Sequence, residues 1–426
     1  MFKLKAILNI GRSIMSILIG NAVVGQSGGP TSAINATLSG VIKGAKELKA
    51  SGTINTLYGM LNGIEGFLEE RLIDLLGFFD SEDKLSILEQ TPASALGSCR
   101  KKMPSLESED VIYEKLLAIF KKYNIRYFFY IGGNDSMDTV SKIGRYTEKC
   151  GYEMRVIGVP KTIDNDLMIT DHTPGFGSAA KYIATTTQEI LRDCSVYTLK
   201  AVTIIEIMGR DAGWLAASAA IGRKVCGYEP DFVYLPERDF DMDKFLSDVR
   251  SALDRHPNVV IAISEGIHFA DGSYVGSALQ NGAVDVFGHK YLAGGGKALE
   301  GIIKEKLGCK VRSIELNLCQ RCAAHIASKT DIDESVAVGK AAANAAAQGE
   351  SRVMMTIDRT PKETYEVSIG TVCVDEIANQ TKLVPDNFIN EEGNGVTDEC
   401  VDYLLPLIQG EISTIYKDGL PVHVII

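Results

Sequence analysis

The sequence lacks the features that mark membrane, nucleic-acid-binding and disulfide-rich proteins. No apolar run reaches the roughly 18 residues that span a bilayer, so we expect no membrane segment. The 44 Lys and Arg are outnumbered by 55 Asp and Glu, whereas nucleic-acid binders normally present a basic face. The nine cysteines are odd in number and scattered, which argues against a disulfide framework and indicates a reducing, cytoplasmic compartment.

Proline is scarce, at 12 residues, while glycine is abundant, at 41. This balance is typical of an α/β protein with tight strand-to-helix turns and not of a disordered chain. A chain of 426 residues is too long for one compact core, which predicts two domains. Cys319 and Cys322 form a lone CxxC without the second pair that zinc would need, and we interpret them as two small, half-buried side chains.

The N-terminal residues 1–14 are interpreted as an extension outside the fold. Their apolar stretch is short, and no A-x-A-like cleavage site follows it, so a signal peptide is not indicated. A second methionine, Met15, directly precedes the first clear strand pattern.

Short apolar segments alternate with segments of helical periodicity along the chain. We predict β-strands at residues 17–25, 126–131, 154–159, 201–207, 259–264 and 310–316. We predict helices at residues 33–49, from 137 to about 146, from 211 onward, after 321 and near 397–409. This alternation predicts parallel sheets with helices on both faces, in which ligands bind beyond the carboxyl ends of the strands. A glycine-rich or polar motif follows each predicted strand, so these motifs should meet at one cleft.

The third strand leads into Pro160-Lys161-Thr162-Ile163-Asp164-Asn165-Asp166. If the backbone stays extended, Thr162, Asp164 and Asp166 point to one side, with Lys161 and Ile163 on the other. A carboxylate beside a sugar hydroxyl can act as general base, and a second carboxylate can hold Mg²⁺ directly or through water. The alternative interpretation is a polar turn held by side-chain-to-backbone hydrogen bonds.

Seven segments in order together resemble the phosphofructokinase family. One of them is the segment 160–166 described above, which resembles the family's catalytic segment. The other six are Gln26-Ser27-Gly28-Gly29-Pro30, Gly97-Ser98-Cys99-Arg100, Gly132-Gly133-Asn134-Asp135-Ser136, Met208-Gly209-Arg210, Ser264-Glu265-Gly266, and Arg312 with Gln320-Arg321. The resemblance covers residues 17–328 through these motifs and the remainder more loosely.

The resemblance implies two Rossmann-like α/β domains of parallel sheets, with the active site in the cleft between them. A donor-phosphate domain would span residues 15–178, completed by about 322–382. A sugar-phosphate domain would span residues 179–321, completed by about 383–426. It also implies an Mg²⁺-dependent transfer of a phosphoryl group to fructose 6-phosphate, a reaction of glycolysis and gluconeogenesis, by a homodimer or larger homo-oligomer.

The resemblance assigns roles to individual positions. Asp164 looks like the general base on the sugar's 1-hydroxyl, and Arg100 like a clamp on the transferring group. Gly28 and Gly29 look like donor-phosphate contacts, since a Cβ at Gly29 would block the backbone's approach. The substrate-binding positions are Thr162, Ile163, Asp166, Met208, Gly209, Arg210, Glu265, Arg312 and Arg321. The implied metal positions are Asn134 and Asp166.

Two positions indicate the phosphoryl donor. The ATP-using branch has Gly where this chain has Asp135 and Lys161, and both residues are of the type found in the pyrophosphate-using branch. A carboxylate at Asp135 would lie near a nucleotide's α-phosphate, and like charges at about 4 Å repel by about 4 kcal/mol near a protein surface. Lys161 is a compact cation that suits a compact, highly charged leaving phosphate. We therefore predict pyrophosphate as the donor and a reversible reaction.

The chain departs from the family pattern at Asn134, where Asp is usual, and at Leu318, where His or Tyr is usual. It also has Cys322-Ala323-Ala324-His325 where Gly-Gly is usual, and Asn317 or His325 could supply substitute contacts. Three alternatives stay open: ATP as donor, sedoheptulose 7-phosphate as acceptor, and a non-catalytic regulatory homologue. The presence of Lys161, Asp164 and Arg210 argues against the last.

Overall fold

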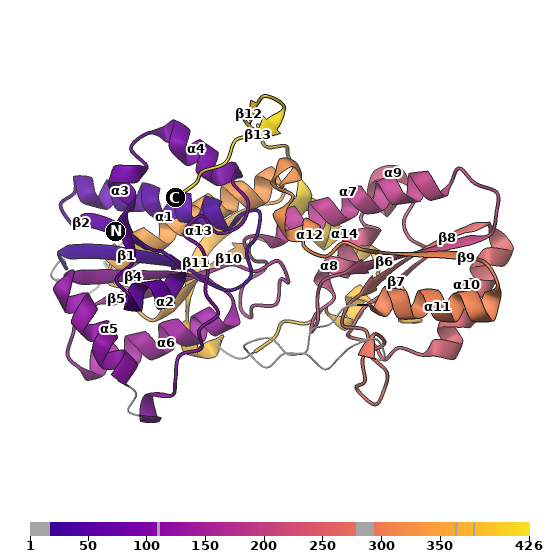
Figure 1. Cartoon of the computed structure of the whole chain (residues 1–426), viewed down its shortest axis with the longest axis horizontal. Helices are drawn as coiled ribbons and strands as arrows, with labels where there is room; N and C mark the ends of the chain where they lie inside the picture. Colours follow the sequence, from indigo (N-terminus) through magenta and orange to yellow (C-terminus); the bar gives the residue numbers. More distant parts are fainter. Residues whose placement is uncertain (1–17, 109–110, 278–293, 363, 378–379) are drawn as a thin grey trace, which may run out of the picture.

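Two separate β-sheets organise the chain into two α/β domains that lie side by side (Figure 1). The structure is a computed structural model that describes residues 18–108, 111–277, 294–362, 364–377 and 380–426. The predicted extension at residues 1–14 lies outside the described residues. The fold class predicted from the sequence, two domains with parallel sheets, is confirmed.

The first domain contains a seven-stranded sheet in the order β11-β10-β5-β4-β1-β2-β3. The strands are β1 Gly20–Gln26, β2 Ile54–Met60, β3 Leu72–Asp74, β4 Ile125–Gly132, β5 Arg155–Pro160, β10 Val353–Arg359 and β11 Val367–Cys373. The five central strands are parallel, but β3 and β11 pair antiparallel at the two edges. The parallel arrangement predicted from the sequence is therefore confirmed for the five central strands, and the two edge strands are antiparallel additions to it.

Helices cover both faces of this sheet. On one face lie α1 Ile34–Ala50 and α13 Lys329–Ala347, and on the other lie α5 Val111–Lys122 and α6 Asn134–Lys149. Shorter helices are α2 Gly63–Leu68, α3 Leu75–Phe78 and α4 Glu82–Gln90. Successive residues of β1 alternate between the two cores, because strand side chains point to opposite faces: Ala22 and Val24 join one core and Val23 the other.

The second domain contains a four-stranded parallel sheet in the order β7-β8-β6-β9. Its strands are β6 Ala201–Ile207, β7 Phe232–Tyr234, β8 Asn258–Ser264 and β9 Lys310–Glu315. Its helices are α7 Phe176–Cys194, α8 Trp214–Ala217, α9 Gly222–Cys226, α10 Met242–Arg255, α11 Gly295–Leu307, α12 Cys319–Cys322 and α14 Asp398–Leu404. The helix expected from residue 211 begins only at Trp214 and lasts four residues.

Short 3-10 helices join several of these elements. They are η1 Leu106–Ser108, η2 Ser218–Ala220, η4 Ala324–Ile326, η5 Val374–Glu376, η6 Asp386–Phe388 and η7 Leu405–Ile408. No helix in the described ranges is long and apolar enough to cross a membrane.

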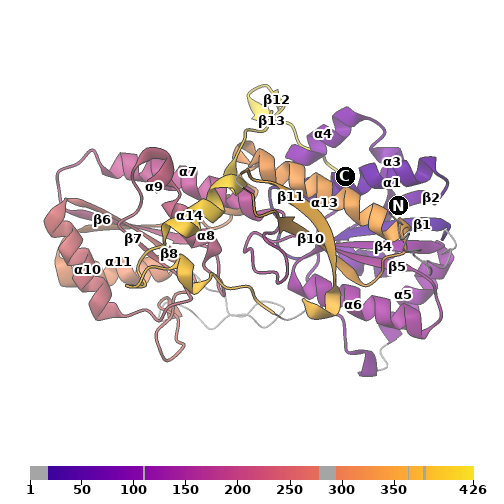
Figure 2. The same cartoon turned by 180° about the vertical axis from the view of Figure 1, so that it is seen from behind.

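The chain crosses between the domains several times. It leaves the first domain at α7 and returns through α13 and β10 (Figure 2). There α13 packs against α1, and β10 pairs with β5. Val384, Val401 and Leu407 then join the core of the second domain. A two-stranded hairpin, β12 Tyr416–Lys417 and β13 Leu420–Pro421, follows near the C-terminus.

The last residues return to the first domain, although the sequence analysis assigned the range 383–426 to the second. The main chains of Ile415 and Val422 bond to the side chain of Gln90, and the N–H of Val424 donates to Thr91. Gln90 is buried, so its amide needs partners, and the tail supplies them.

Helices α1 and α13 pack so closely that glycines are required where they meet. A Cβ on Gly40 would lie 2.1 Å from the carbonyl oxygen of Val336, and one on Gly339 would lie 2.1 Å from that of Thr37. No side-chain motion can relieve these contacts, because both obstacles are backbone atoms. Glycine at these two positions therefore allows α13, which comes late in the sequence, to pack directly against α1 of the first domain.

We expect Gly40→Ala to lower the free energy of unfolding by about 1–3 kcal/mol, since the helices must separate to admit the methyl group. The matched control is Gly301→Ala in α11, where an added Cβ would meet nothing within 4 Å. The control should be neutral or stabilising by up to about 1 kcal/mol, because Ala is a better helix former than Gly. Denaturant unfolding measures both, and equal midpoints for the two variants would contradict the packing argument.

Candidate active site

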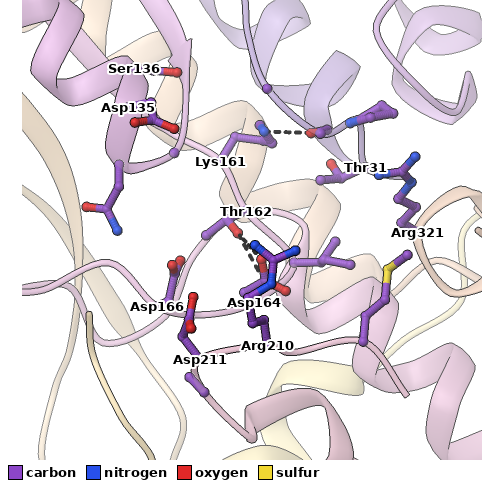
Figure 3. A pocket seen from close by; sticks show the side chains of 18 of the residues that line it. Thr31, Asp135, Ser136, Lys161, Thr162, Asp164, Asp166, Arg210, Asp211 and Arg321 are labelled. Atoms are coloured by element: carbon purple, nitrogen blue, oxygen red, sulfur yellow. Dashed lines mark hydrogen bonds between the residues drawn. The ribbon is translucent and has the colours of Figure 1, made fainter. Parts of the chain in front are cut away.

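A cavity of about 500 Å³ lies between the two domains, beyond the carboxyl ends of strands from both sheets (Figure 3). Both domains therefore line one site. The sequence-predicted residues around it are Gly28, Gly29, Arg100, Asn134, Asp135, Lys161, Thr162, Ile163, Asp164, Asp166, Met208, Arg210, Glu265 and Arg321. Gly209 lies between two of these, whereas Arg312 lies elsewhere.

The turn after β1 forms one wall of the cavity. Gly28 has φ +75°, in the left-handed region that favours glycine. A Cβ on Gly29 would meet only a guanidinium nitrogen of Arg321, at 3.5 Å, which is an ordinary contact. The protein's own packing does not demand glycine at position 29, and the space there is open to a ligand.

A buried pair of amides ties this turn to the segment that carries Arg100. The Nε2 of Gln26 donates to Asn35 Oδ1 at 2.9 Å, and Gln26 Oε1 accepts from the N–H of Leu96 at 3.0 Å. Asn35 also accepts from the N–H of Ala95 and donates to the carbonyl of Thr91. Both amides are fully buried, so this arrangement holds the segment 91–96 in one position.

Two hydrogen bonds then hold the segment that follows against the glycine turn. Ser98 Oγ donates to the carbonyl of Gly28 at 2.7 Å, and the N–H of Gly28 donates to the carbonyl of Cys99 at 3.2 Å. Arg100, the next residue, thereby reaches the rim of the cavity.

Lys161 lies at the base of the cavity with only 3% of its surface exposed. Its Nζ donates to the carbonyl of Gly29 at 2.6 Å, so it joins the end of β5 to the turn after β1. Burial lowers the pKa of the Lys161 ammonium to about 8, against the opposing attraction of Asp164 and Asp166. The ammonium group is therefore bonded to a backbone oxygen, and the attraction of two carboxylates favours its charged form.

The segment after Lys161 turns and is not extended, which corrects the alternation expected from the sequence. The N–H of Asp164 donates to Thr162 Oγ1 at 3.1 Å, and Thr162 Oγ1 donates to Asp164 Oδ2 at 3.3 Å. Asn165 has φ 54°. This geometry is the polar turn of the alternative interpretation, and it brings Lys161 and Ile163 to the cavity together with the other side chains.

The carboxylates at the base of the cavity hold their protons more tightly than usual. Burial raises the pKa of Asp164, and it raises the pKa of Asp166 to about 7, with the charge of Asp164 adding to the effect. Burial, again with the charge of Asp164, raises the pKa of Glu265 to about 7. The pKa values of Asp166 and Glu265 therefore lie near neutral pH, where a general base works best, and the pKa of Asp164 is shifted in the same direction.

Lys382, which the sequence does not single out, braces the turn at residues 162–166 from a distant part of the chain. Its N–H donates to the carbonyl of Asp166 at 2.8 Å, and its Nζ donates to Asn165 Oδ1 at 3.2 Å and to the carbonyl of Asp171 at 2.7 Å. Trp214 Nε1 in turn donates to the carbonyl of Lys382 at 2.9 Å. No local motif marks Lys382, because its role depends on a contact across more than 200 residues.

On the second domain, the turns after β6 and β8 interlock. Gly209 has φ +125°, and its N–H donates to Glu265 Oε1 at 3.4 Å. A Cβ on Gly266 would lie 1.9 Å from the carbonyl oxygen of Arg210, so only glycine fits there. This close approach fixes Arg210 and Glu265 side by side at the cavity.

Asp211 is a further cavity residue that the sequence analysis did not select. Figure 3 shows its carboxylate beside that of Asp166, and its charge contributes to the raised pKa of both Asp164 and Asp166. Its place directly after Met208-Gly209-Arg210 could have identified it from the sequence. That residue was instead predicted to begin a helix.

The two predicted arginines of the distal segment lie in different places. Arg321 reaches the cavity, where burial and the charge of Arg100 lower its pKa. Arg312 is exposed on β9, facing Asp193 and Cys194 in a separate hollow of about 260 Å³. Neither Asn317 nor His325, the suggested substitutes, lines the main cavity, and Leu318 is also exposed.

Asn134 begins α6 at the donor side of the cavity, and Asp135 is the next residue. Asn134 Nδ2 donates to the carbonyl of Gln380 at 3.0 Å, while its buried Oδ1 has no partner among the described residues. Across the described ranges, no group of three or more His, Cys, Asp or Glu is arranged to hold a metal ion.

The chain is similar to known phosphofructokinases along nearly all of its length. It matches the phosphofructokinase family over residues 21–346. It is 42% identical over 403 residues to the pyrophosphate–fructose 6-phosphate 1-phosphotransferase of Halomonas elongata, covering 94% of each chain. It is 41% identical over 406 residues to the enzyme of that name from Methylococcus capsulatus, covering 95% of each.

Solved structures agree with the sequence relatives. The crystal structure of the pyrophosphate-dependent phosphofructokinase from Nitrosospira multiformis superimposes with a TM-score of 0.85 at 41% identity, covering 95% of this chain and 96% of the other. Together with the two-domain fold and the seven segments around one cavity, these similarities show that the chain belongs to the phosphofructokinase family.

Proposed function

We propose that the chain transfers a phosphoryl group from pyrophosphate to the 1-hydroxyl of fructose 6-phosphate, giving fructose 1,6-bisphosphate and phosphate. The observation that carries the donor assignment is the placement of Asp135 and Lys161 at the same cavity. A nucleotide would bring an α-phosphate towards the Asp135 carboxylate, and pyrophosphate has none. The relatives at 41–42% identity bear the name of this same activity.

The base of the cavity supports proton transfer from the sugar. Asp164 takes the proton of the 1-hydroxyl, and Thr162 orients its carboxylate through the 3.3 Å hydrogen bond. Because burial raises the pKa of Asp164, its carboxylate is a stronger base than an exposed aspartate. Arg210 and Glu265, held by the glycine contact between their turns, bind the acceptor sugar from the second domain.

The donor side supports the developing negative charge. Lys161, Arg100 and Arg321 are the cations that line this part of the cavity. Positioned charges of this kind stabilise a transition state without reorganising during the reaction. We propose that the turn at Gly28 and Gly29 presents backbone N–H groups to the pyrophosphate, because the space above Gly29 is open.

The oxygen groups of the site fit Mg²⁺ arriving with the substrate. Asn134 Oδ1 is buried without a partner among the described residues, and Asp166 faces the same cavity. Mg²⁺ commonly binds one or two protein oxygens and takes its remaining ligands from substrate phosphates and water. Once bound, the ion neutralises charge on the pyrophosphate, and Asn134 and Asp166 are the residues that would hold it.

We also propose that the chain works as a homodimer or larger assembly in the cytoplasm. Arg312 is exposed and lies outside its own chain's cavity, so it is available to a neighbouring subunit's sugar-phosphate site. All nine cysteines are free, which fits a reducing compartment.

The donor assignment is tested with purified protein, fructose 6-phosphate and Mg²⁺. We expect turnover with pyrophosphate and little with ATP, and turnover with ATP alone would overturn the assignment. Sedoheptulose 7-phosphate in place of fructose 6-phosphate tests the alternative acceptor in the same assay.

Asp164→Asn should reduce kcat by about 10²–10⁴-fold, because the amide cannot accept the hydroxyl proton. Asp164→Ser should behave similarly. Circular dichroism and the unfolding midpoint should stay close to those of the wild type, which separates lost chemistry from lost folding. Full activity in either variant would refute the base assignment.

Asp135→Asn removes the charge at the donor side, and Asp135→Gly removes both charge and bulk. We expect the KM for ATP to fall in both, by up to about a thousandfold if the repulsion of about 4 kcal/mol is fully relieved. A gain only in the Gly variant would assign the exclusion of ATP to space and not to charge. No gain in either would show that another feature excludes ATP.

The pH profile of kcat/KM should be bell-shaped. Activity should fall below about pH 7 as carboxylates with raised pKa values take up protons, and above about pH 8 as Lys161 loses its charge. Lys161→Arg should abolish the alkaline limb, because guanidinium keeps its proton. The substrates titrate identically in both proteins, so a limb that persists in the variant would belong to the substrate or to another group.

A further inference from the structure

The pair Cys319 and Cys322 has no part in the phosphoryl-transfer chemistry described above. The two residues form the ends of the single turn α12, and both are exposed, although the sequence analysis expected them to be half-buried. Both thiols are free. An exposed pair of thiols at this spacing is open to exchange with a small disulfide.

Cys319 and Cys322 are three residues apart in one helical turn, a spacing that makes side chains neighbours on the helix surface. Cys322 Sγ donates to the carbonyl of Cys319 at 3.8 Å. Burial raises the pKa of the Cys322 thiol, and the neighbouring Cys319 thiol contributes to the same shift. Each sulfur is therefore within electrostatic reach of the other.

Closing a disulfide here must tighten the turn. Residues three apart in a helical turn have Cβ atoms about 5–6 Å apart. A disulfide needs about 3.5–4.5 Å between the same atoms. The two ends of α12 therefore have to approach by roughly 1–2 Å.

Of the two residues between the cysteines, Arg321 lines the cavity, and Gln320 contacts Met208, which also lines it. Gln320 is 1% exposed, and its Oε1 accepts from the N–H of Met208 at 3.2 Å. Arg321 extends into the cavity towards Gly29, and its carbonyl accepts from Ser32 Oγ at 3.4 Å. A tightened turn cannot leave these contacts unchanged, because the backbone of both residues lies inside it.

We propose that Cys319 and Cys322 form a thiol–disulfide modification site that weakens substrate binding by displacing Gln320 and Arg321. The readout in activity rests on the function proposed above. The oxidant is a small disulfide, RSSR, such as oxidised glutathione. One cysteine thiolate attacks RSSR and releases RS⁻, and the second thiolate then displaces another RS⁻ to close the intramolecular bond. The two cysteine protons end on two RSH, so the protein is oxidised by two electrons and RSSR is reduced.

The fold makes this modification reversible. Strained or exposed disulfides are the labile ones, and this bond would be both. In a reducing cytoplasm the pair stays reduced and the enzyme active, while a rise in small disulfides closes the bond. Disulfides in such compartments are usually transient and redox-sensing.

The experiment treats the reduced, full-length protein with oxidised glutathione and follows two independent properties. Mass spectrometry of the peptide that spans both cysteines measures bond formation without any assay of activity. Calorimetry with fructose 6-phosphate, together with the pyrophosphate-dependent rate, measures the effect on the site. The variants are Cys319→Ser and Cys322→Ser, and the control is Cys150→Ser, an exposed thiol at the end of α6 away from the cavity.

We expect the wild type and Cys150→Ser to form the bond, with the Kd and KM for fructose 6-phosphate rising at least about tenfold, since ångström-scale misplacement can cost about 10²-fold. Dithiothreitol should restore both values. The two serine variants should keep normal reduced activity and lose the response. No bond between Cys319 and Cys322, or a bond that leaves binding and rate unchanged, would overturn the proposal. A reduced protein that neither binds nor turns over fructose 6-phosphate would instead contradict the proposed function, while the mapped peptide would still decide whether the modification occurs.

Discussion

The site depends on a buried ammonium group whose charge is favoured by two half-buried carboxylates. Lys161 bonds to the carbonyl of Gly29, and the negative charges of Asp164 and Asp166 favour its charged form. An isolated charge at this depth would be expensive, so each partner makes the other tolerable. Burial lowers the pKa of Lys161 to about 8 and raises that of Asp166 to about 7, so both groups titrate near neutral pH.

The repeated crossing of the chain between the domains keeps this charge cluster in place. The turn at residues 162–166 follows β5 and is braced by Lys382, whose carbonyl accepts a hydrogen bond from Trp214 of the second domain. Helix α13 returns to pack on α1 through glycines, so the first domain is completed only late in the sequence. Buried hydrogen bonds therefore link the two domains, in addition to the chain segments that run between them. At the turn α12 these contacts lie next to the protein surface, because Gln320 and Arg321 stand between two exposed cysteines.

Much of the fold could be predicted from local patterns, and the errors have identifiable causes. The strand at residues 201–207 coincides with β6, because its side chains are buried on both faces and most of them are apolar. Strand β2 was not predicted, since its sequence Ile-Asn-Thr-Leu-Tyr-Gly-Met mixes polar and apolar residues on a half-covered part of the sheet. The edge strand β11 has no fully buried residue and was missed for the same reason. The alternation of side chains at residues 162–166 required an extended backbone, but hydrogen bonds between Thr162 and Asp164 fold the segment into the polar turn of the alternative interpretation.

The sequence by itself determined the family, the order of the motifs and the chemical types available at the site. Those features depend on residues close together in the chain, such as Gly132 to Ser136 and Lys161 to Asp166. Only the tertiary structure decided that Arg321 reaches the cavity while Arg312 does not, and that Asp211 and Lys382 belong to the site or its support. It also decided the pKa values, because they follow from burial and from charges contributed by distant segments. Burial is a property of the packed molecule, and no local pattern specifies it.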